Sequence, residues 1–247
     1  MHSTNYIIMF IVGLTATSAL ILALLFTGFK PMHERNEALF NKRAILAAVD
    51  TKLDKKVKSM SDTEVEEIFA SDIQQIALNM DGLEVSSEEI IAKGYKGGQA
   101  EHIDMKKEKK KPEEDRILPL FIYNNNGEKI YIVSVRGNGL WDEIWGNIAL
   151  EDNFDKIVGA TFDHQAETPG LGAEIKDNPK FGEMFIGKEI YDEQTYVGVN
   201  VRKGGAKSEL HDVDGISGAT ITCNGVTEMI QRGIQYYEPY FEAAKNN

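Results

Sequence analysis

The first stretch of the chain is uniformly apolar, and its length predicts a helix that crosses a membrane. Residues 7–29 read IIMFIVGLTATSALILALLFTGF and contain no Asp, Glu, Lys or Arg. A helix of this length would span roughly 34 Å, which is enough for a hydrocarbon core of about 30 Å. A cleaved signal peptide is the alternative, but it needs a basic start and a shorter apolar core. Because residues 1–6 contain no Lys or Arg, we favour an uncleaved anchor over residues 1–29.

Two segments beyond Lys30 repeat their apolar positions at helical spacing. Residues 32–58 predict a helix that continues the anchor outward, so we assign residues 30–59 to a helical stalk. Ser61 to Glu64 form a capping-box pattern, and apolar positions follow on one face as far as Ile76. This pattern predicts a second helix that Asp81–Gly82 would end.

A charged segment, EHIDMKKEKKKPEEDR, occupies residues 101–116. It holds six basic and six acidic residues, so its net charge is zero. One interpretation is a patch for nucleic acid or lipid around Lys106–Lys111. We favour the other, a solvated mobile loop, because runs of mixed charge usually face water.

From Leu118 onward the pattern changes to short β-rich runs. Residues 120–123 and 129–137 flank the turn cluster Asn124–Gly127 and predict a hairpin. Further strands are predicted at 156–164, 183–187 and 196–204, and a final helix at about 220–244. We therefore predict one α+β domain over residues 60–247, with an antiparallel sheet and packed helices.

Composition changes this picture in two respects. The averages (a mean hydropathy of −0.31 and a net charge of −12) describe a soluble acidic protein, yet all charged residues lie beyond position 29. The acidic balance argues against a partner such as nucleic acid. The single cysteine, Cys223, excludes an intramolecular disulfide, and five scattered histidines give no ligand-like pairing, so no metal site is predicted.

Three glycine-rich loops are candidates for a functional site. They are Gly137–Trp141, His164–Gly172 and Asp214–Thr222. The last lies between a strand and a helix, where small residues allow close approach and free amide groups favour a phosphate. A plain helix start capped by Ser or Thr is an equally good reading of the residues alone. Nothing in the spacing shows that the three loops meet.

The third loop also approaches the G-x-S-x-G pattern of serine hydrolases at residues 215–219. The pattern fails at its last glycine, where Ala219 stands, and no histidine follows Ser217. We therefore set a hydrolase aside.

The runs DGISGATIT, ETPGLG and GNGLW, in this chain at 214–222, 167–172 and 137–141, resemble the FMN-binding domain of bacterial membrane flavoproteins. With a single N-terminal anchor and this length, the chain is most similar to the C subunit of the sodium-translocating NADH:quinone reductase. The resemblance covers essentially the whole chain. The G subunit of the ion-translocating ferredoxin:NAD oxidoreductase is an alternative, and a non-enzymatic anchored assembly module is a second.

The resemblance implies that FMN is attached covalently, through its phosphate, to Thr220, and that a flavin transferase with FAD as donor installs it. Asp214, Ser217, Gly218 and Ala219 would complete the attachment motif. The other cofactor-binding residues implied by the resemblance are Trp141 and Leu171 beside the isoalloxazine, Glu167, Thr168 and Gly172 in the loop at its polar edge, and Lys203 reaching it from a neighbouring strand. A cysteinyl flavin at Cys223 is the alternative, and we disfavour it because the threonine motif is complete.

The same resemblance implies an electron-relay subunit that works with other membrane and flavin subunits and with quinone reduction. No G-x-G-x-x-G unit is present, so we expect no independent NADH site. The family places its flavin domain on the periplasmic side of the bacterial inner membrane. Lys30, Arg35, Lys42 and Arg43 follow the apolar segment, and by the positive-inside rule they would put the domain in the cytoplasm. We side with the family on this point.

Overall fold

The computed structural model describes residues 3–125 and 127–245 of the chain, which divides into two compact units, Met1–Phe40 and Asn41–Asn247. The helices are α1 (Thr4–Ala47), α2 (Asp62–Asp72), α3 (Ser87–Ala92), α4 (Met105–Glu108), α5 (Glu174–Asp177), α6 (Pro179–Glu183), α7 (Thr220–Gln235) and α8 (Glu238–Lys245), with 3-10 turns η1 (Val57–Ser59), η2 (Ala100–His102) and η3 (Glu113–Asp115). The strands are β1 (Ile73–Asn79), β2 (Ile117–Asn125), β3 (Glu128–Asn138), β4 (Glu143–Leu150), β5 (Ile157–His164), β6 (Tyr191–Asp192), β7 (Thr195–Tyr196), β8 (Asn200–Arg202) and β9 (Asp212–Asp214).

The first unit consists of the greater part of α1. This helix is long and apolar enough to cross a membrane, and its apolar side chains between Tyr6 and Phe29 are exposed. Its backbone groups are bonded along the helix, which is the arrangement that a hydrocarbon environment requires.

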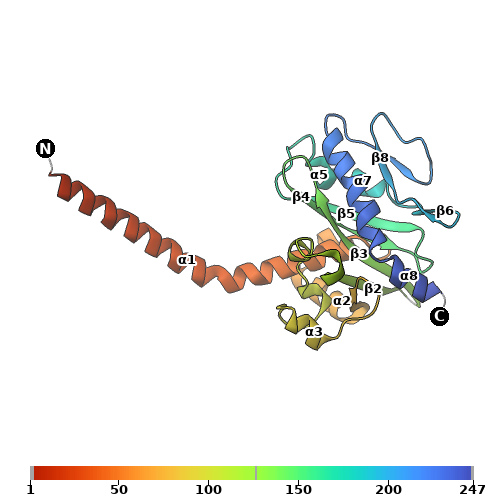
Figure 1. The fold of residues 1–247 in the computed structure, drawn as a ribbon, viewed down its shortest axis with the longest axis horizontal. Coiled ribbons are helices and arrows are strands. Elements are labelled where there is room, and N and C mark those ends of the chain that lie inside the picture. The colour runs from red at the N-terminus through yellow and green to blue at the C-terminus, as the bar shows by residue number, and fades with distance from the viewer. Residues whose placement is uncertain (1–2, 126, 246–247) are drawn as a thin grey trace. The chain divides into compact units, whose positions relative to one another are not determined.

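The second unit is built on a five-stranded antiparallel sheet in the order β1-β2-β3-β4-β5. Helix α7 packs against β3, and Figure 1 shows this blue helix lying across the sheet. On that face Leu120 and Ile122 join the core that α7 completes, while Phe121 contacts Phe69 of α2. The α+β class with an antiparallel sheet is confirmed, because all neighbouring strands in this sheet pair antiparallel and helices pack against it.

Several predicted elements are confirmed. The hairpin around Asn124–Gly127 is β2–β3, and the predicted strand at 156–164 is β5. The capping box is present at the start of α2, where the Ser61 hydroxyl accepts from Glu64 N and the Glu64 carboxylate accepts from Ser61 N.

Two predicted helices are wrong in their ends. The helix predicted over 32–58 ends at Ala47, where the chain turns and the Asp50 carboxylate accepts from Val57 N at 2.7 Å. The helix predicted to reach Asp81 ends at Asp72, and the residues that follow form β1. The spacing of Ile73 and Ile76 fits a helix, but seven residues of β1 pair with β2 and this pairing prevails.

Three further predictions need correction. The strand predicted at 183–187 is the end of α6 and a turn, because Phe181 and Phe185 pack together against Phe162 at helical spacing. The helix predicted over 220–244 is divided into α7 and α8. In the run predicted as a strand at 196–204, only short pieces in β7 and β8 are extended, and β4 is a strand that the pattern does not predict.

The segment 101–116 contains α4 and η3 and begins within η2. Its centre is the carboxylate of Glu108, which is 1% exposed. This carboxylate accepts hydrogen bonds from Tyr95 Oη, from Lys111 Nζ at 2.6 Å and from Ile117 N at 2.9 Å. A buried carboxylate with three donors fixes the segment to the sheet, so the interpretation as a loop without regular structure is wrong, whereas Lys106, Lys107 and Lys110 face solvent as expected.

Candidate functional site

The three glycine-rich loops meet at one end of strands β3, β4 and β5. In the register of β3 and β4, Asn138 pairs with Glu143, so Gly139–Asp142 forms the connecting turn. In the register of β4 and β5, Ile144 pairs with His164, which places the loop after β5 beside that turn. Helix α7 approaches the same turn, because a Cβ at Gly225 would lie 2.1 Å from the Asn138 carbonyl oxygen.

Glu167 joins all three loops through a buried carboxylate. Its side chain is 5% exposed. Oε1 accepts from Trp141 N at 3.0 Å, and Oε2 accepts from Thr222 Oγ1 at 2.6 Å. Its own backbone N donates to His164 Nδ1 at 3.1 Å. Glu167 therefore lies among the three loops, but its carboxylate faces the protein.

Helix α7 begins at Thr220, the predicted attachment residue, which is half-buried. The N-cap position belongs to Ala219, whose methyl group can form no hydrogen bond, so the reading of this motif as a Ser or Thr cap is wrong. The first amides of a helix have no partner within it, and here they start a long helix next to exposed Ser217 and Gly218. A phosphate could be held at this helix terminus.

The backbone conformation at Gly218 requires glycine at this position of the motif. Its φ is +79°, a conformation that glycine adopts without strain. A Cβ there would also lie 2.8 Å from Leu171 Cδ2. The contact shows that the predicted residues Leu171 and Gly218 are neighbours although they belong to different loops.

Two exposed apolar side chains border the site. Trp141 is 68% exposed, and its indole Nε1 donates to Thr168 Oγ1 at 3.1 Å. Leu171 is also exposed. Exposed apolar side chains beside a helix N-terminus suit a ligand that has both an aromatic and an anionic part.

The remaining predicted residues lie at the margin. Gly172 is buried against Glu167, since a Cβ there would be 2.3 Å from Oε2. Asp214 Oδ1 accepts from Ala206 N at 2.7 Å and so holds the loop between β8 and β9. Lys203 is exposed directly after β8, and its backbone N lies 3.4 Å from the Cβ position at Gly215. The structure thus places Lys203 near the motif by its backbone.

Cys223 is buried in α7, in an environment that disfavours reactivity. Its Sγ accepts from Ile216 N at 3.3 Å. Burial raises the pKa of the thiol above its ordinary value, which keeps it protonated and unreactive. A buried neutral thiol is a poor attachment point for a flavin.

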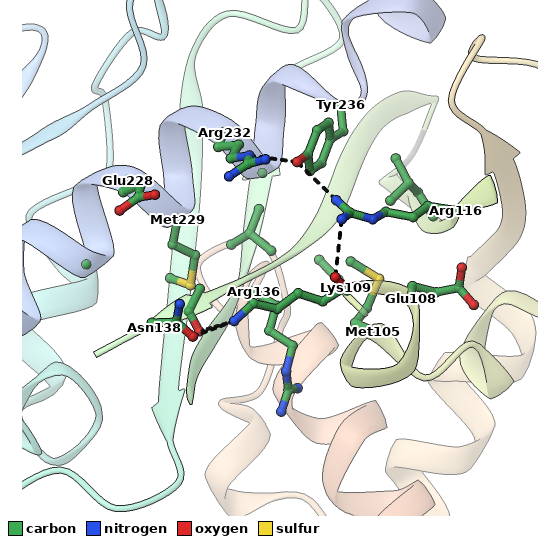
Figure 2. Close-up of a pocket in the computed structure, with 16 residues that line it drawn as sticks. Met105, Glu108, Lys109, Arg116, Arg136, Asn138, Glu228, Met229, Arg232 and Tyr236 are labelled. Carbon is green, nitrogen blue, oxygen red and sulfur yellow. Dashed lines mark hydrogen bonds between the residues drawn. The ribbon is translucent and has the colours of Figure 1, made fainter. Parts of the chain in front are cut away.

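A cavity of about 190 Å³ lies behind the site, between α4, β3 and α7. Figure 2 shows its polar side chains engaged with one another: Arg116 donates to Tyr236 Oη at 3.1 Å and to the Lys109 carbonyl at 3.2 Å. Lys109 Nζ reaches Asn138 Oδ1 at 2.6 Å and the Gly137 carbonyl at 3.2 Å. The folded 101–116 segment therefore supports the Gly137–Trp141 loop from behind.

Sequence reasoning missed two residues of this arrangement, the acceptor Asn138 and the clamped hydroxyl of Thr222. From the sequence alone, Thr222 is only one of several hydroxyl groups in the motif. Its burial follows from the helical position two residues after Thr220, which turns it to a different face of the helix. That signal becomes readable once the start of the helix is placed at Thr220.

Comparison with known proteins gives a consistent picture. The family described as the FMN-binding domain matches residues 139–235, which include all three loops in large part. The C subunit of the Na(+)-translocating NADH-quinone reductase of Vibrio campbellii is 30% identical over 234 residues, covering 87% of this chain and 85% of that protein. The C subunit of Neisseria meningitidis serogroup A is 28% identical over 248 residues, or 96% of this chain and 92% of that protein.

Solved structures agree. The C subunit of Parabacteroides distasonis superposes with a TM-score of 0.72 at 31% identity, covering 86% of this chain and 96% of that one. The Shewanella oneidensis protein, at 24% identity and a TM-score of 0.69, shares the fold over 87% of this chain. With its near full-length relatives, its matched domain and its three converging loops, the chain belongs to the C-subunit family of the Na⁺-translocating NADH-quinone reductase.

Proposed function

We propose that the chain is a membrane-anchored flavoprotein subunit that relays electrons through an FMN bound covalently at Thr220. One observation carries the proposal: Thr220 opens α7 at the place where the three predicted loops converge. The match of residues 139–235 to the FMN-binding domain covers this place.

The residues present fit FMN. The first amides of α7 suit the phosphate, and Gly218 leaves the backbone open beside it. Trp141 and Leu171 would flank the isoalloxazine ring, with Thr168 and Lys203 at its edge. When bound, FMN supplies the ability to take and release single electrons. The residues around it supply its position and the polarity of its surroundings.

Attachment needs one phosphoryl-transfer step. The Thr220 hydroxyl oxygen forms a bond to the FMN-side phosphorus of FAD, and the bond from that phosphorus to the bridging oxygen breaks. AMP leaves with the bridging oxygen, and the hydroxyl proton passes to solvent. A flavin transferase with a divalent cation would catalyse the step, because the charge on the pyrophosphate must be neutralised.

We further propose that the chain works inside the Na⁺-translocating NADH:quinone reductase, where it exchanges electrons with other membrane and flavin subunits while NADH binds elsewhere. A tethered cofactor suits this role, because an electron carrier must retain its flavin through many turnovers. The relatives named for this complex support the assignment.

The anchor would be α1 in the lipid of the bacterial inner membrane, with the flavin domain on the periplasmic side. Support comes from the exposed apolar stretch of α1 and from the family resemblance. The basic residues that follow the apolar segment favour the opposite orientation. Protease added outside spheroplasts should digest the C-terminal domain, and a domain that resists digestion until lysis would overturn the periplasmic assignment.

The attachment site is tested by co-expressing the chain with its flavin transferase and inspecting a denaturing gel for flavin fluorescence. We expect a fluorescent band for the wild type and none for Thr220→Ala. Cys223→Ser is the matched control in the same helix, and it should remain fluorescent. A fluorescent Thr220→Ala band would refute threonine attachment.

A further inference from the structure

We infer that Glu167 is a positioning residue that clamps Thr222 and thereby fixes the direction in which Thr220 is presented. The inference rests on the proposed function, since it concerns the FMN attachment site. The family resemblance places Glu167 at the polar edge of the flavin. Its two carboxylate oxygens are instead occupied by Trp141 N and Thr222 Oγ1.

The environment of the carboxylate holds it in a single place. A Cβ at Gly139 would lie 2.4 Å from Oε1, and a Cβ at Gly172 would lie 2.3 Å from Oε2. Two glycines thus form the walls around the group, and neither wall could carry a side chain without displacing it. Because a buried charge is costly without hydrogen bonds, the carboxylate keeps both of its donors.

The clamp separates the two threonines of the first turn of α7. Residues two apart in a helix point to different faces. Thr222 is 1% exposed, and its hydroxyl donates a hydrogen bond to Glu167 Oε2 at 2.6 Å. Thr220, in contrast, is half-buried and follows the exposed Gly218 of the motif. Glu167 therefore keeps the Thr222 hydroxyl bonded and unavailable to a transferase. The same hydrogen bond fixes the rotation of α7 about its axis, and with it the direction of Thr220.

The same carboxylate sets the position of Trp141. The Trp141 amide is held by Oε1, and its indole is held by Thr168 Oγ1, one residue along the chain from Glu167. The Glu167 carboxylate thus positions both the first turn of α7, through Thr222, and the loop that carries Trp141. Loss of the clamp should loosen the relation between them even where the fold persists.

The decisive variants are Thr222→Val, which has nearly the same shape without the hydroxyl, and Thr222→Ser, which restores it. Full-length protein in detergent is incubated with flavin transferase, FAD and Mg²⁺, and the initial rate of FMN incorporation is measured. The fluorescence anisotropy of the attached flavin is then recorded on fully loaded protein. Asn224→Ala, at an exposed position of the same helix, is the matched control.

We expect Thr222→Val to lower the incorporation rate about tenfold, a ratio equivalent to about 1.4 kcal/mol. We also expect a lower flavin anisotropy, because the ring would move more freely. Thr222→Ser should recover both values and Asn224→Ala should change neither. Glu167→Gln, which has the shape of glutamate without its charge, should fall between Thr222→Val and the wild type.

The outcomes distinguish the two proposals. If the wild type takes up no flavin at Thr220, the proposed function fails. If the wild type is labelled at Thr220 but folded Thr222→Val matches it in rate and anisotropy, the clamp alone is refuted. Should Thr222→Val fail to fold, as judged by circular dichroism, Thr222→Ala decides in its place, since it also lacks the hydroxyl that bonds to Glu167, and wild-type values for that variant would refute the clamp.

Discussion

At the scale of single residues, the site depends on places where a side chain is missing. Gly139 and Gly172 admit the Glu167 carboxylate, Gly218 adopts a positive φ, and Gly225 lets α7 approach the Gly137–Trp141 loop. Each glycine is therefore required for a different contact. Their common effect is to bring three loops of different origin within hydrogen-bond distance of each other.

Gly225→Ala tests whether close approach outweighs helix propensity. Replacing a helical glycine by alanine ordinarily stabilises a helix by about 1 kcal/mol. Here the new methyl group would meet the Asn138 carbonyl at 2.1 Å, and overpacking of this kind costs about 1–3 kcal/mol. We expect a net loss of stability, seen as a melting temperature lowered by about 2–4 °C per kcal/mol.

The control for this substitution is Asn224→Ala in the same helix turn, at an exposed position. It gains helix propensity without the contact and should raise the melting temperature slightly. A Gly225→Ala protein more stable than the wild type would show that α7 can shift away from the loop.

At the scale of elements, polar side chains decide where segments begin and how they are held. The capping box of α2 depends on Glu64, whose pKa is lowered to about 2, first by its hydrogen bond with Lys55 and then by the Ser61 backbone amide. The segment 101–116 depends on the buried carboxylate of Glu108.

The depressed pKa of Glu64 predicts a pH dependence for the start of α2. Its folded pKa of about 2 lies below the ordinary value of 4.5, so its contribution to stability is complete above pH 4.5. The contribution is lost as the pH falls towards 2. Amide exchange at Ser61 should accelerate relative to neighbouring helical amides in this window, and Glu64→Gln should abolish the pH dependence.

Glu108→Ala should release the 101–116 segment. The substitution leaves Ile117 N, Tyr95 Oη and Lys111 without their acceptor, and removal of one partner from a buried charged pair costs about 3 kcal/mol or more. We expect faster cleavage by trypsin in the lysine run 106–111. Glu114→Ala, at an exposed position of the same segment, should leave the cleavage rate unchanged.

Elements whose signals are local could be predicted from the sequence. The capping box, the hairpin turn and the apolar helix each depend on adjacent residues, and the structure contains all three. Prediction fails where a distant partner decides: β1 is a strand because β2 lies beside it, and 101–116 is folded because Glu108 finds three donors. For the site, the three loops are identifiable by their glycines, but their meeting depends on the long-range link from Glu167 to Thr222.

At the scale of the whole molecule, the chain combines two kinds of surface. All charged residues lie beyond position 29, and most of them belong to the unit Asn41–Asn247. The large apolar side chains between Tyr6 and Phe29 are exposed. The second unit has a core of its own, formed by the sheet, α7 and α8. Each unit is thus suited to a different solvent.

A chain beginning at Asn41 should therefore dissolve without detergent and still accept FMN at Thr220. It retains Arg43, which bonds to the Val57 and Met60 carbonyls and to Asp62, and so keeps the ordered start of the domain. The full chain should require detergent. Both properties are measured by ultracentrifugation and in-gel flavin fluorescence, and an aggregated fragment would show that residues before 41 are needed for folding.

The exposed Trp141 gives the protein an internal optical probe. The sequence contains two tryptophans, Trp141 in the site loop and Trp145 in β4, where the Arg136 guanidinium lies over its ring at 4.8 Å. A flavin placed beside Trp141 would accept excitation energy from both rings. Indole emission should therefore dim as each molecule acquires its cofactor, so that maturation can be followed continuously in an unlabelled sample.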